Sequence, residues 1–210
     1  MPRAADVMAE LSASDFRALV QARSGHFVLE SGYHAGLWLD LDSLFASPRA
    51  IAPFVERLAA RLRAYEPHMV CGPLLGGALL AQALATVLGV EFCFTQPAPS
   101  PSAPALFRAR YLLPPAFQGR VRNRRVALVD DVMSAGSSLR ATSEELRSYG
   151  AIPVAVGALM TLGDVGERHF KTQGLAVEAV VRDELEVWVP SACSLCARGV
   201  PLEDPSAEQG

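Results

Sequence analysis

Two adjacent carboxylates, Asp130 and Asp131, follow an apolar run and precede a loop rich in small hydroxyl side chains. The apolar run, residues 126–129, is typical of a buried strand in a parallel sheet, and such strands present their carboxyl ends to a ligand. The loop offers backbone N–H groups and hydroxyls at an expected helix N-terminus, which favours a phosphate. It comprises Ser134, Ala135, Gly136, Ser137 and Ser138. Because sugar hydroxyls need acceptors and a phosphate needs donors, this order predicts a sugar-phosphate site.

A glycine-rich loop forms the second segment of interest. Residues 72–81 read Gly-Pro-Leu-Leu-Gly-Gly-Ala-Leu-Leu-Ala, where a strand is expected to end and a helix to begin. Glycine lets backbone N–H groups approach an anion without an intervening Cβ. Close packing of a helix against a strand would use the same residues, just as a helix cap and an ordinary turn would account for residues 130–138.

A third segment lies near the N-terminus. Residues 24–34 read Ser-Gly-His-Phe-Val-Leu-Glu-Ser-Gly-Tyr-His and continue into Leu-Trp-Leu-Asp at residues 37–40. Taken alone, this pattern predicts a β-hairpin.

Composition limits the classes of function. The 210 residues are half hydrophobic, which is enough for one sizeable core and one main domain. The net charge of −3 gives no basic surface for nucleic acid. Because there is no signal-peptide pattern and no apolar run long enough to span a bilayer, we expect a cytoplasmic protein without nucleic-acid or membrane partners.

Four cysteines are too few for a disulfide framework. Cys71 and Cys93 lie in apolar runs and are expected to be buried thiols. Cys193 and Cys196 form a C-x-x-C pair, which is half of a zinc site, and the sequence shows no second such pair. A structural metal and a pair of plain thiols both remain open.

Helical and strand patterns alternate along the chain, which predicts an α/β fold with a central parallel sheet. Helices are expected at residues 48–64, 78–88, 139–149 and 164–173, and strands at 68–72, 90–95, 126–129, 152–160, 177–181 and 187–189. Six prolines interrupt residues 96–125, and a connection of this length is usually functional or disordered.

With the three segments in this order, the chain resembles the type I phosphoribosyltransferases and is most similar to orotate phosphoribosyltransferases. Residues 126–138 resemble the family's signature for phosphoribosyl diphosphate (PRPP), and residues 24–40 resemble the segment that covers the base. Residues 199–204, Gly-Val-Pro-Leu-Glu-Asp, extend the resemblance to the C-terminal region.

The resemblance implies a Rossmann-like parallel sheet flanked by helices, with a small N-terminal hood subdomain. It divides the chain into a base-covering segment at residues 1–45, a core at 46–190 with a flexible proline-rich hood loop at 96–124, and a tail at 191–210 that carries the C-x-x-C pair. It also implies Mg2+ bound through PRPP, PRPP and a nucleobase (orotate favoured) as partners, and a homodimer.

The same resemblance assigns roles to individual residues. Asp130 and Asp131 would hold the ribose, and residues 134–138 its 5′-phosphate. The pyrophosphate would lie on Leu74, Leu75, Gly76 and Gly77, and the base on Phe27, Glu30 and Ser31.

The hood departs from the family pattern. Relatives usually bring a lysine to the diphosphate, whereas Lys171 is the only lysine in this chain. Arg108 and Arg110 are the available catalytic cations, although arginine does not replace lysine freely in a tuned site. The expected activity is transfer of phosphoribose to orotate, giving orotidine 5′-monophosphate and pyrophosphate for pyrimidine biosynthesis. Two alternatives are a transferase for another base and a PRPP or nucleotide sensor without turnover.

Overall fold

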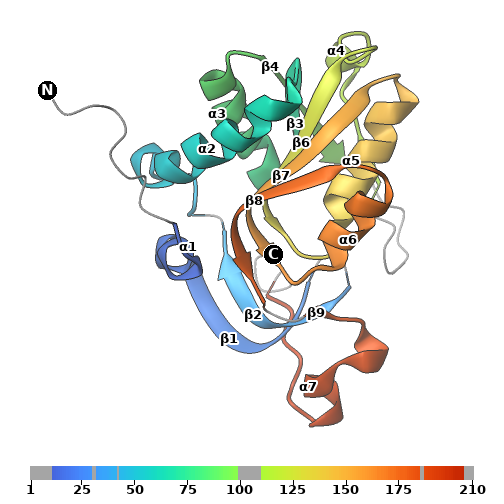
Figure 1. The fold of residues 1–210 in the computed structure, drawn as a ribbon. Coiled ribbons are helices and arrows are strands. Elements are labelled where there is room, and N and C mark those ends of the chain that lie inside the picture. The colour runs from blue at the N-terminus through green and yellow to red at the C-terminus, as the bar shows by residue number, and fades with distance from the viewer. Residues whose placement is uncertain (1–10, 30–31, 42, 99–109, 185–186, 206–210) are drawn as a thin grey trace, which may run out of the picture.

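A computed structural model describes residues 11–29, 32–41, 43–98, 110–184 and 187–205, which form two sheets and their covering helices (Figure 1). Three residues assigned from sequence, Glu30, Ser31 and Arg108, lie outside the described residues. Within those ranges, no helix is both long and apolar enough to cross a membrane.

The large sheet has six strands in the order β5-β4-β3-β6-β7-β8, and all neighbours are parallel except β4 and β5. Its strands are β3 (Met69–Pro73), β4 (Glu91–Pro97), β5 (Tyr111–Leu112), β6 (Arg125–Met133), β7 (Ile152–Leu162) and β8 (Ala176–Asp183). The inner strands β3, β6 and β7 consist mainly of buried residues, as expected for a sheet covered on both faces.

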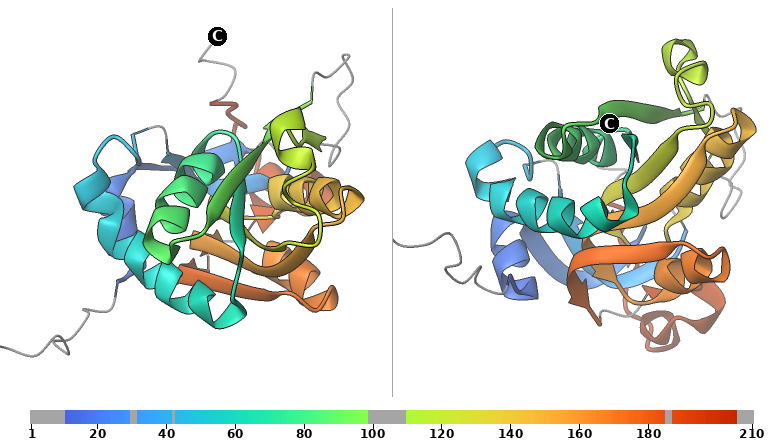
Figure 2. Two further views of the ribbon diagram at one scale, coloured as in Figure 1. Left: turned by 90° about the horizontal axis from the view of Figure 1, so that it is seen from above. Right: turned by 45° about the horizontal axis from the view of Figure 1, so that its top comes forward.

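Helices cover both faces of this sheet and create two separate cores (Figures 1 and 2). On one face, α2 (Pro48–Leu62) and α3 (Gly76–Leu88) pack with apolar side chains of the strands. On the other, α5 (Ser137–Ser148) and α6 (Val165–Thr172) enclose a second cluster that includes Leu139 and Phe170. The amphipathic spacing of Ile51, Phe54, Val55, Leu58 and Leu62 places all five on the buried side of α2.

A smaller antiparallel sheet lies against the carboxyl ends of the large one (Figure 1). It has the order β1-β2-β9 and joins β1 (Gln21–Val28) and β2 (His34–Asp40) to β9 (Val187–Trp188), far away in sequence. Short helices flank it: α1 (Ala13–Leu19) before β1, and a 3-10 turn (Pro190–Ala192) followed by α7 (Ser194–Ala197) after β9.

The predicted α/β class and the flanked parallel sheet are confirmed, with two local differences. The strand expected at residues 126–129 continues through the acid pair to Met133, because β6 keeps pairing with β7 as far as Met133 and Thr161. The proline-rich stretch contains β5 and a short helix, α4 (Pro115–Gln118), where the sequence showed no periodicity. Strand β5 forms because Leu112 and Tyr111 pair with Gln96 and Pro97 of β4.

Candidate active site

The strand order reverses between β3 and β6. From β3 the chain proceeds to β4 on one side, whereas from β6 it proceeds to β7 and β8 on the other. In open α/β sheets, ligands bind outside the carboxyl ends of strands at such a switch point, because the two following helices leave in opposite directions. A cavity of about 390 Å3 lies there, lined by residues that follow β3, the end of β6 and part of β2.

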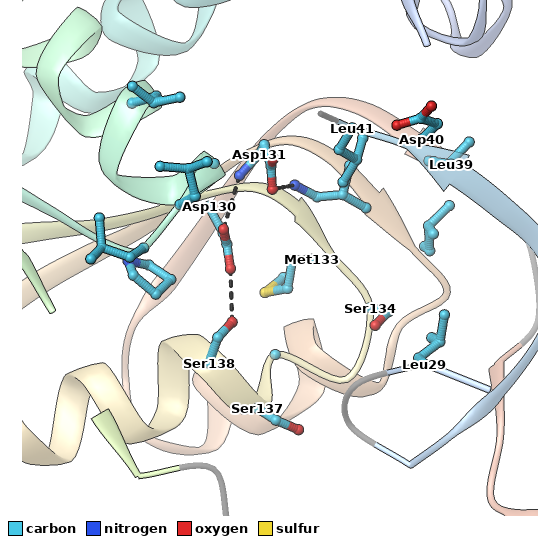
Figure 3. A pocket seen from close by; sticks show the side chains of 18 of the residues that line it. Leu29, Leu39, Asp40, Leu41, Asp130, Asp131, Met133, Ser134, Ser137 and Ser138 are labelled. Carbon is cyan, nitrogen blue, oxygen red and sulfur yellow. Dashed lines mark hydrogen bonds between the residues drawn. The ribbon is translucent and has the colours of Figure 1, made fainter. Parts of the chain in front are cut away.

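The acid pair occupies the floor of this cavity (Figure 3). Asp130 and Asp131 are both buried and both line it. The Ser138 hydroxyl donates to Asp130 Oδ2 at 2.8 Å, and the Val132 N–H donates to Asp131 Oδ1 at 2.8 Å. Both carboxylates are therefore held in defined orientations.

The hydroxyl-rich loop connects β6 to α5 and borders the same cavity (Figure 3). Gly136 stands at the helix N-cap with φ of +72°, a left-handed conformation that favours glycine. Within the described residues, no side chain caps the first turn of α5, so its N–H groups face the loop with the Ser137 and Ser138 hydroxyls. This arrangement supplies hydrogen-bond donors where a phosphate is favoured.

The glycine-rich loop packs directly against the acid pair. A Cβ at Gly76 would lie 2.7 Å from Asp131 Cγ and nearer still to Oδ2, and one at Gly77 would lie 2.7 Å from Asp130 Oδ1. Glycine at these positions lets α3 begin beside the carboxylates. The peptide bond between Leu74 and Leu75 is cis.

Strand β2 forms the opposite wall. Four consecutive residues, Leu37, Trp38, Leu39 and Asp40, line the cavity. Because side chains alternate between the two faces of a strand, four lining residues in succession mean that the backbone edge of β2 also borders the cavity. In the described ranges β9 pairs with His34 and Ala35 of β2 and with none of residues 37–39.

The charge of the cavity is negative. Among the described lining residues, Asp40, Asp130 and Asp131 are acidic and none is lysine or arginine. A polyanionic ligand would therefore meet repulsion unless cations accompany it.

Burial raises the pKa of Asp130 well above the ordinary value of an aspartate, and the neighbouring charge of Asp131 raises it further. The Ser138 hydrogen bond acts in the opposite direction, because it favours the ionised form. A ligand that offers donors or positive charge to Asp130 would remove this penalty.

The raised pKa predicts that Asp130 lowers the stability of the ligand-free protein at neutral pH. A group whose pKa is raised on folding contributes its full stability below its unfolded pKa, about 3.9, and loses it as the pH rises through the folded value. We expect Asp130→Asn to raise the melting temperature at about pH 8 by roughly 2–4 °C, the shift that 1 kcal/mol gives at this size. Thermal unfolding followed by circular dichroism measures it.

The difference should shrink towards about pH 3, below the unfolded pKa of about 3.9, where the carboxyl is mostly neutral in both states. Equal effects of the substitution at both pH values would contradict the assignment of an ionisation penalty to Asp130. Asp164→Asn, at an exposed position at the start of α6, serves as the control.

The structure brings together most of the predicted site, with several exceptions. Of the predicted phosphate loop, Ser134, Gly136, Ser137 and Ser138 line the cavity, whereas Ala135 is buried beneath them. Leu74, Leu75 and Gly76 line it as well, while Gly77 packs behind them on Asp130.

Among the described residues, one predicted base contact, Phe27, and one predicted hood cation, Arg110, do not line the cavity. Phe27 is buried against Trp38 and beneath the Arg23 guanidinium, and it is absent from the described lining. Leu29, which follows β1, lines the cavity. Arg110 is exposed beside β5 and also stands outside the described lining.

Sequence reasoning missed Asp40 and Tyr111 as lining residues. Asp40 carried a signal, since it ends an apolar strand pattern in the segment that resembles the base cover. Tyr111 carried none, because β5 depends on pairing with β4.

Comparison with known proteins agrees with this geometry. The model of the phosphoribosyl transferase domain matches residues 41–191. An orotate phosphoribosyltransferase from Thermotoga maritima is 31% identical over 183 residues, covering 87% of this chain and 90% of that protein. One from Caldanaerobacter subterraneus subsp. tengcongensis is 28% identical, covering 92% and 95%.

Solved structures share the fold. Orotate phosphoribosyltransferase from Aeropyrum pernix superposes with a TM-score of 0.61 at 22% identity, covering 80% of this chain and 89% of that one. Adenine phosphoribosyltransferase from Thermoanaerobacter pseudethanolicus superposes with a TM-score of 0.60 at 18% identity, covering 81% and 99%. The fold is therefore common to enzymes named for different bases. The domain match over most of the chain, the identity to curated relatives and the cavity at the switch point together show that this chain belongs to the phosphoribosyl transferase family of pentosyltransferase enzymes.

Proposed function

We propose that this protein transfers the phosphoribosyl group of PRPP to orotate. In this reaction a bond forms between a base nitrogen and C1 of the ribose, while the bond from C1 to a pyrophosphate oxygen breaks and the base nitrogen loses its proton to the departing pyrophosphate or to water. The products are orotidine 5′-monophosphate and pyrophosphate, and the reaction belongs to pyrimidine biosynthesis. The observation that carries the proposal is the cavity itself, which joins the acid pair, the hydroxyl-rich loop, the glycine-rich loop and β2.

The arrangement of these four elements matches the parts of PRPP and a base. The loop before α5 offers hydrogen-bond donors for the 5′-phosphate, and Asp130 and Asp131 offer acceptors for the ribose hydroxyls. The backbone at residues 74–76 lies beside the carboxylates, where the pyrophosphate would leave. Fixed positions for both ends of the sugar would hold C1 between the departing oxygen and the incoming base.

The donor set of the cavity fits Mg2+. Carboxylate oxygens are the ligands that this ion prefers, and the described lining lacks any other positive charge for the diphosphate. Asp130 and Asp131 are the residues that would hold it, directly or through water. When bound with PRPP, Mg2+ neutralises the diphosphate and makes it a better leaving group.

The base is assigned to the β2 wall. The apolar side chains of Leu29, Leu37 and Leu39 would contact the flat faces of a pyrimidine. The backbone of residues 37–39, which β9 does not pair with, would offer N–H donors and carbonyl acceptors to the edge of the ring. The names of the relatives favour orotate among pyrimidines.

A second candidate is a sensor that binds PRPP or a nucleotide without turnover. The absence of lysine and arginine from the described lining favours it, because a transferase must stabilise the charge of departing pyrophosphate. Homodimer formation, in which a neighbour could supply cations, stays a prediction.

Pyrophosphate release distinguishes these functions. The protein is incubated with Mg2+, PRPP and one base at a time, taken from orotate, uracil, adenine and hypoxanthine. We expect release with orotate alone, at about 1–1,000 turnovers per second as is usual for enzymes, and no release when EDTA replaces Mg2+. A coupled pyrophosphate assay measures the rate.

Release with a different base would show that this base, rather than orotate, is the substrate, and that the protein is still a transferase. Binding of PRPP by calorimetry without release from any base would establish the sensor. Failure to bind PRPP in the presence of Mg2+ would refute the site assignment.

A further inference from the structure

Four metal-binding side chains from opposite ends of the chain converge beside the small sheet. His26 lies on β1 and His34 is the first residue of β2. Cys193 is the N-cap of α7, and Cys196 lies within that helix. Their four ligand atoms all lie within 4.8 Å of one another. Figure 1 shows how the ends of β1, β2 and β9 gather next to the segment that carries α7.

Four of the six separations lie within a few tenths of an ångström of the edges of a tetrahedron around zinc. His26 Nε2 lies 3.1 Å from His34 Nδ1, 3.4 Å from Cys193 Sγ and 3.7 Å from Cys196 Sγ, and the last sulfur lies 3.3 Å from His34 Nδ1. A tetrahedral zinc ion with bonds of about 2.0–2.1 Å to nitrogen and 2.3 Å to sulfur requires ligand separations of roughly 3.3–3.8 Å.

The orientation of His26 is fixed by its other ring nitrogen. His26 Nδ1 donates a hydrogen bond to the Val200 carbonyl at 2.8 Å, which leaves the lone pair of Nε2 directed at the cluster. Metal-binding histidines are usually held in this way. The backbone reinforces the contact, because Glu203 N donates to the His26 carbonyl at 2.8 Å and Val28 N donates to the Glu203 carbonyl at 3.0 Å.

Burial argues against a chance meeting of polar side chains. His26, His34 and Cys193 are 1%, 6% and 4% exposed. Thiols are weak hydrogen-bond donors, so two thiols give poor compensation for burying two imidazoles away from water. A metal ion satisfies all four groups at once.

We propose that His26, His34, Cys193 and Cys196 bind one zinc ion that fastens the C-terminal tail to the β1–β2 hairpin. A set of two cysteine sulfurs and two histidine nitrogens is typical of structural zinc sites. Because four protein ligands complete the coordination, no position is left for water or substrate, and the site is structural. It is separate from the proposed Mg2+ site in both residues and ligand chemistry.

The zinc site acts on the strand that borders the cavity. His34 and Leu37 lie three residues apart on β2, or about 10 Å at the usual rise of a strand. By fixing the start of β2 to the tail, zinc would hold the wall to which we assign the base. The metal assignment itself does not depend on which base is used.

Metal analysis of the full-length protein tests the proposal. We expect about one zinc ion per chain after expression with added zinc and purification without chelators. After the zinc is removed with a chelator, cobalt(II) should bind and give the visible absorption of a tetrahedral site with thiolate charge-transfer bands. Because this experiment uses the native sequence, it does not depend on whether a variant folds.

Matched substitutions identify the ligands. Cys196→Ser and His26→Ala should lose the metal, whereas Cys71→Ser and His68→Ala, which change the same residue types outside the cluster, should retain it. Chelation should lower the melting temperature of the native protein and leave that of Cys196→Ser unchanged, because only a bound ion stabilises the folded state. Native protein without zinc and without the cobalt spectrum would overturn the proposal, as would full zinc content in Cys193→Ser, Cys196→Ser double variants.

Discussion

Asp131→Asn is expected to lower kcat/KM for PRPP by about 100- to 1,000-fold, the loss that follows removal of one preorganised electrostatic contact in an active site. Asparagine has nearly the same shape, but it lacks the negative charge and one of the two acceptor oxygens. Asp131 lies in the floor of the cavity beside the start of α3, where it would contact the ribose or its metal. Initial rates at varied PRPP and saturating orotate and Mg2+ measure the effect.

The control for this substitution is Asp164→Asn, which changes the same residue type at an exposed position. Circular dichroism and a melting curve establish that both variants are folded. Activity of Asp131→Asn within a factor of about three of the native rate, far below the loss expected from a lost contact, would remove Asp131 from the site.

Gly76→Ala is expected to reduce kcat/KM about 100-fold, a loss typical when a reacting group is displaced by about 1 Å. The new methyl group would overlap with the Asp131 carboxylate, which is itself buried, so the carboxylate must move out of the position set by the Val132 N–H. Overpacking should also destabilise the protein by about 1–3 kcal/mol. Rates and urea unfolding measured on the same preparation separate the two effects.

Gly119→Ala is the matched control. Gly119 ends α4 in a right-handed conformation, and no described neighbour lies within 4 Å of the added Cβ. We expect native activity and unchanged or slightly higher stability, because alanine reduces the entropy of the unfolded chain. If Gly76→Ala behaves like Gly119→Ala, the close contact between the loop and Asp131 has no role in catalysis.

The parts of the fold that depend on local pattern could be predicted from the sequence. The helix at α2 follows from its apolar spacing, with a proline at its first position, and β3, β6 and β7 follow from buried runs. The acid pair and the hydroxyl-rich loop could also be predicted, because all their residues are close together in sequence. The end of β6 could not be predicted, since its last residues are held by pairing with β7 rather than by their own apolar character.

The parts that depend on distant pairing could not be predicted. The C-x-x-C pair was predicted as half of a zinc site, and the structure places beside it two histidines that lie more than 150 residues earlier, on the β1–β2 hairpin. The spacing of the two histidines in the sequence is not one typical of a metal site. They come together only because β1 and β2 pair as a hairpin. Phe27 was assigned to the base by resemblance, yet the side-chain alternation of β1 directs it into the interior beside Trp38.

The pairing of β2 with β9, and of residues 26–28 with Glu203, has a consequence for the order of biosynthesis. The hairpin leaves the ribosome before the strands of the large sheet, but its third strand and its tail contacts leave after them. The six-stranded sheet contains only residues up to Asp183, so it can assemble while the hairpin still lacks its partners. Contacts of such long sequence separation form slowly because the intervening loop must close first. A nascent chain would therefore complete the large sheet, with the loop to which we assign the phosphate, before the wall to which we assign the base, and synthesis must reach the tail before the pocket is complete.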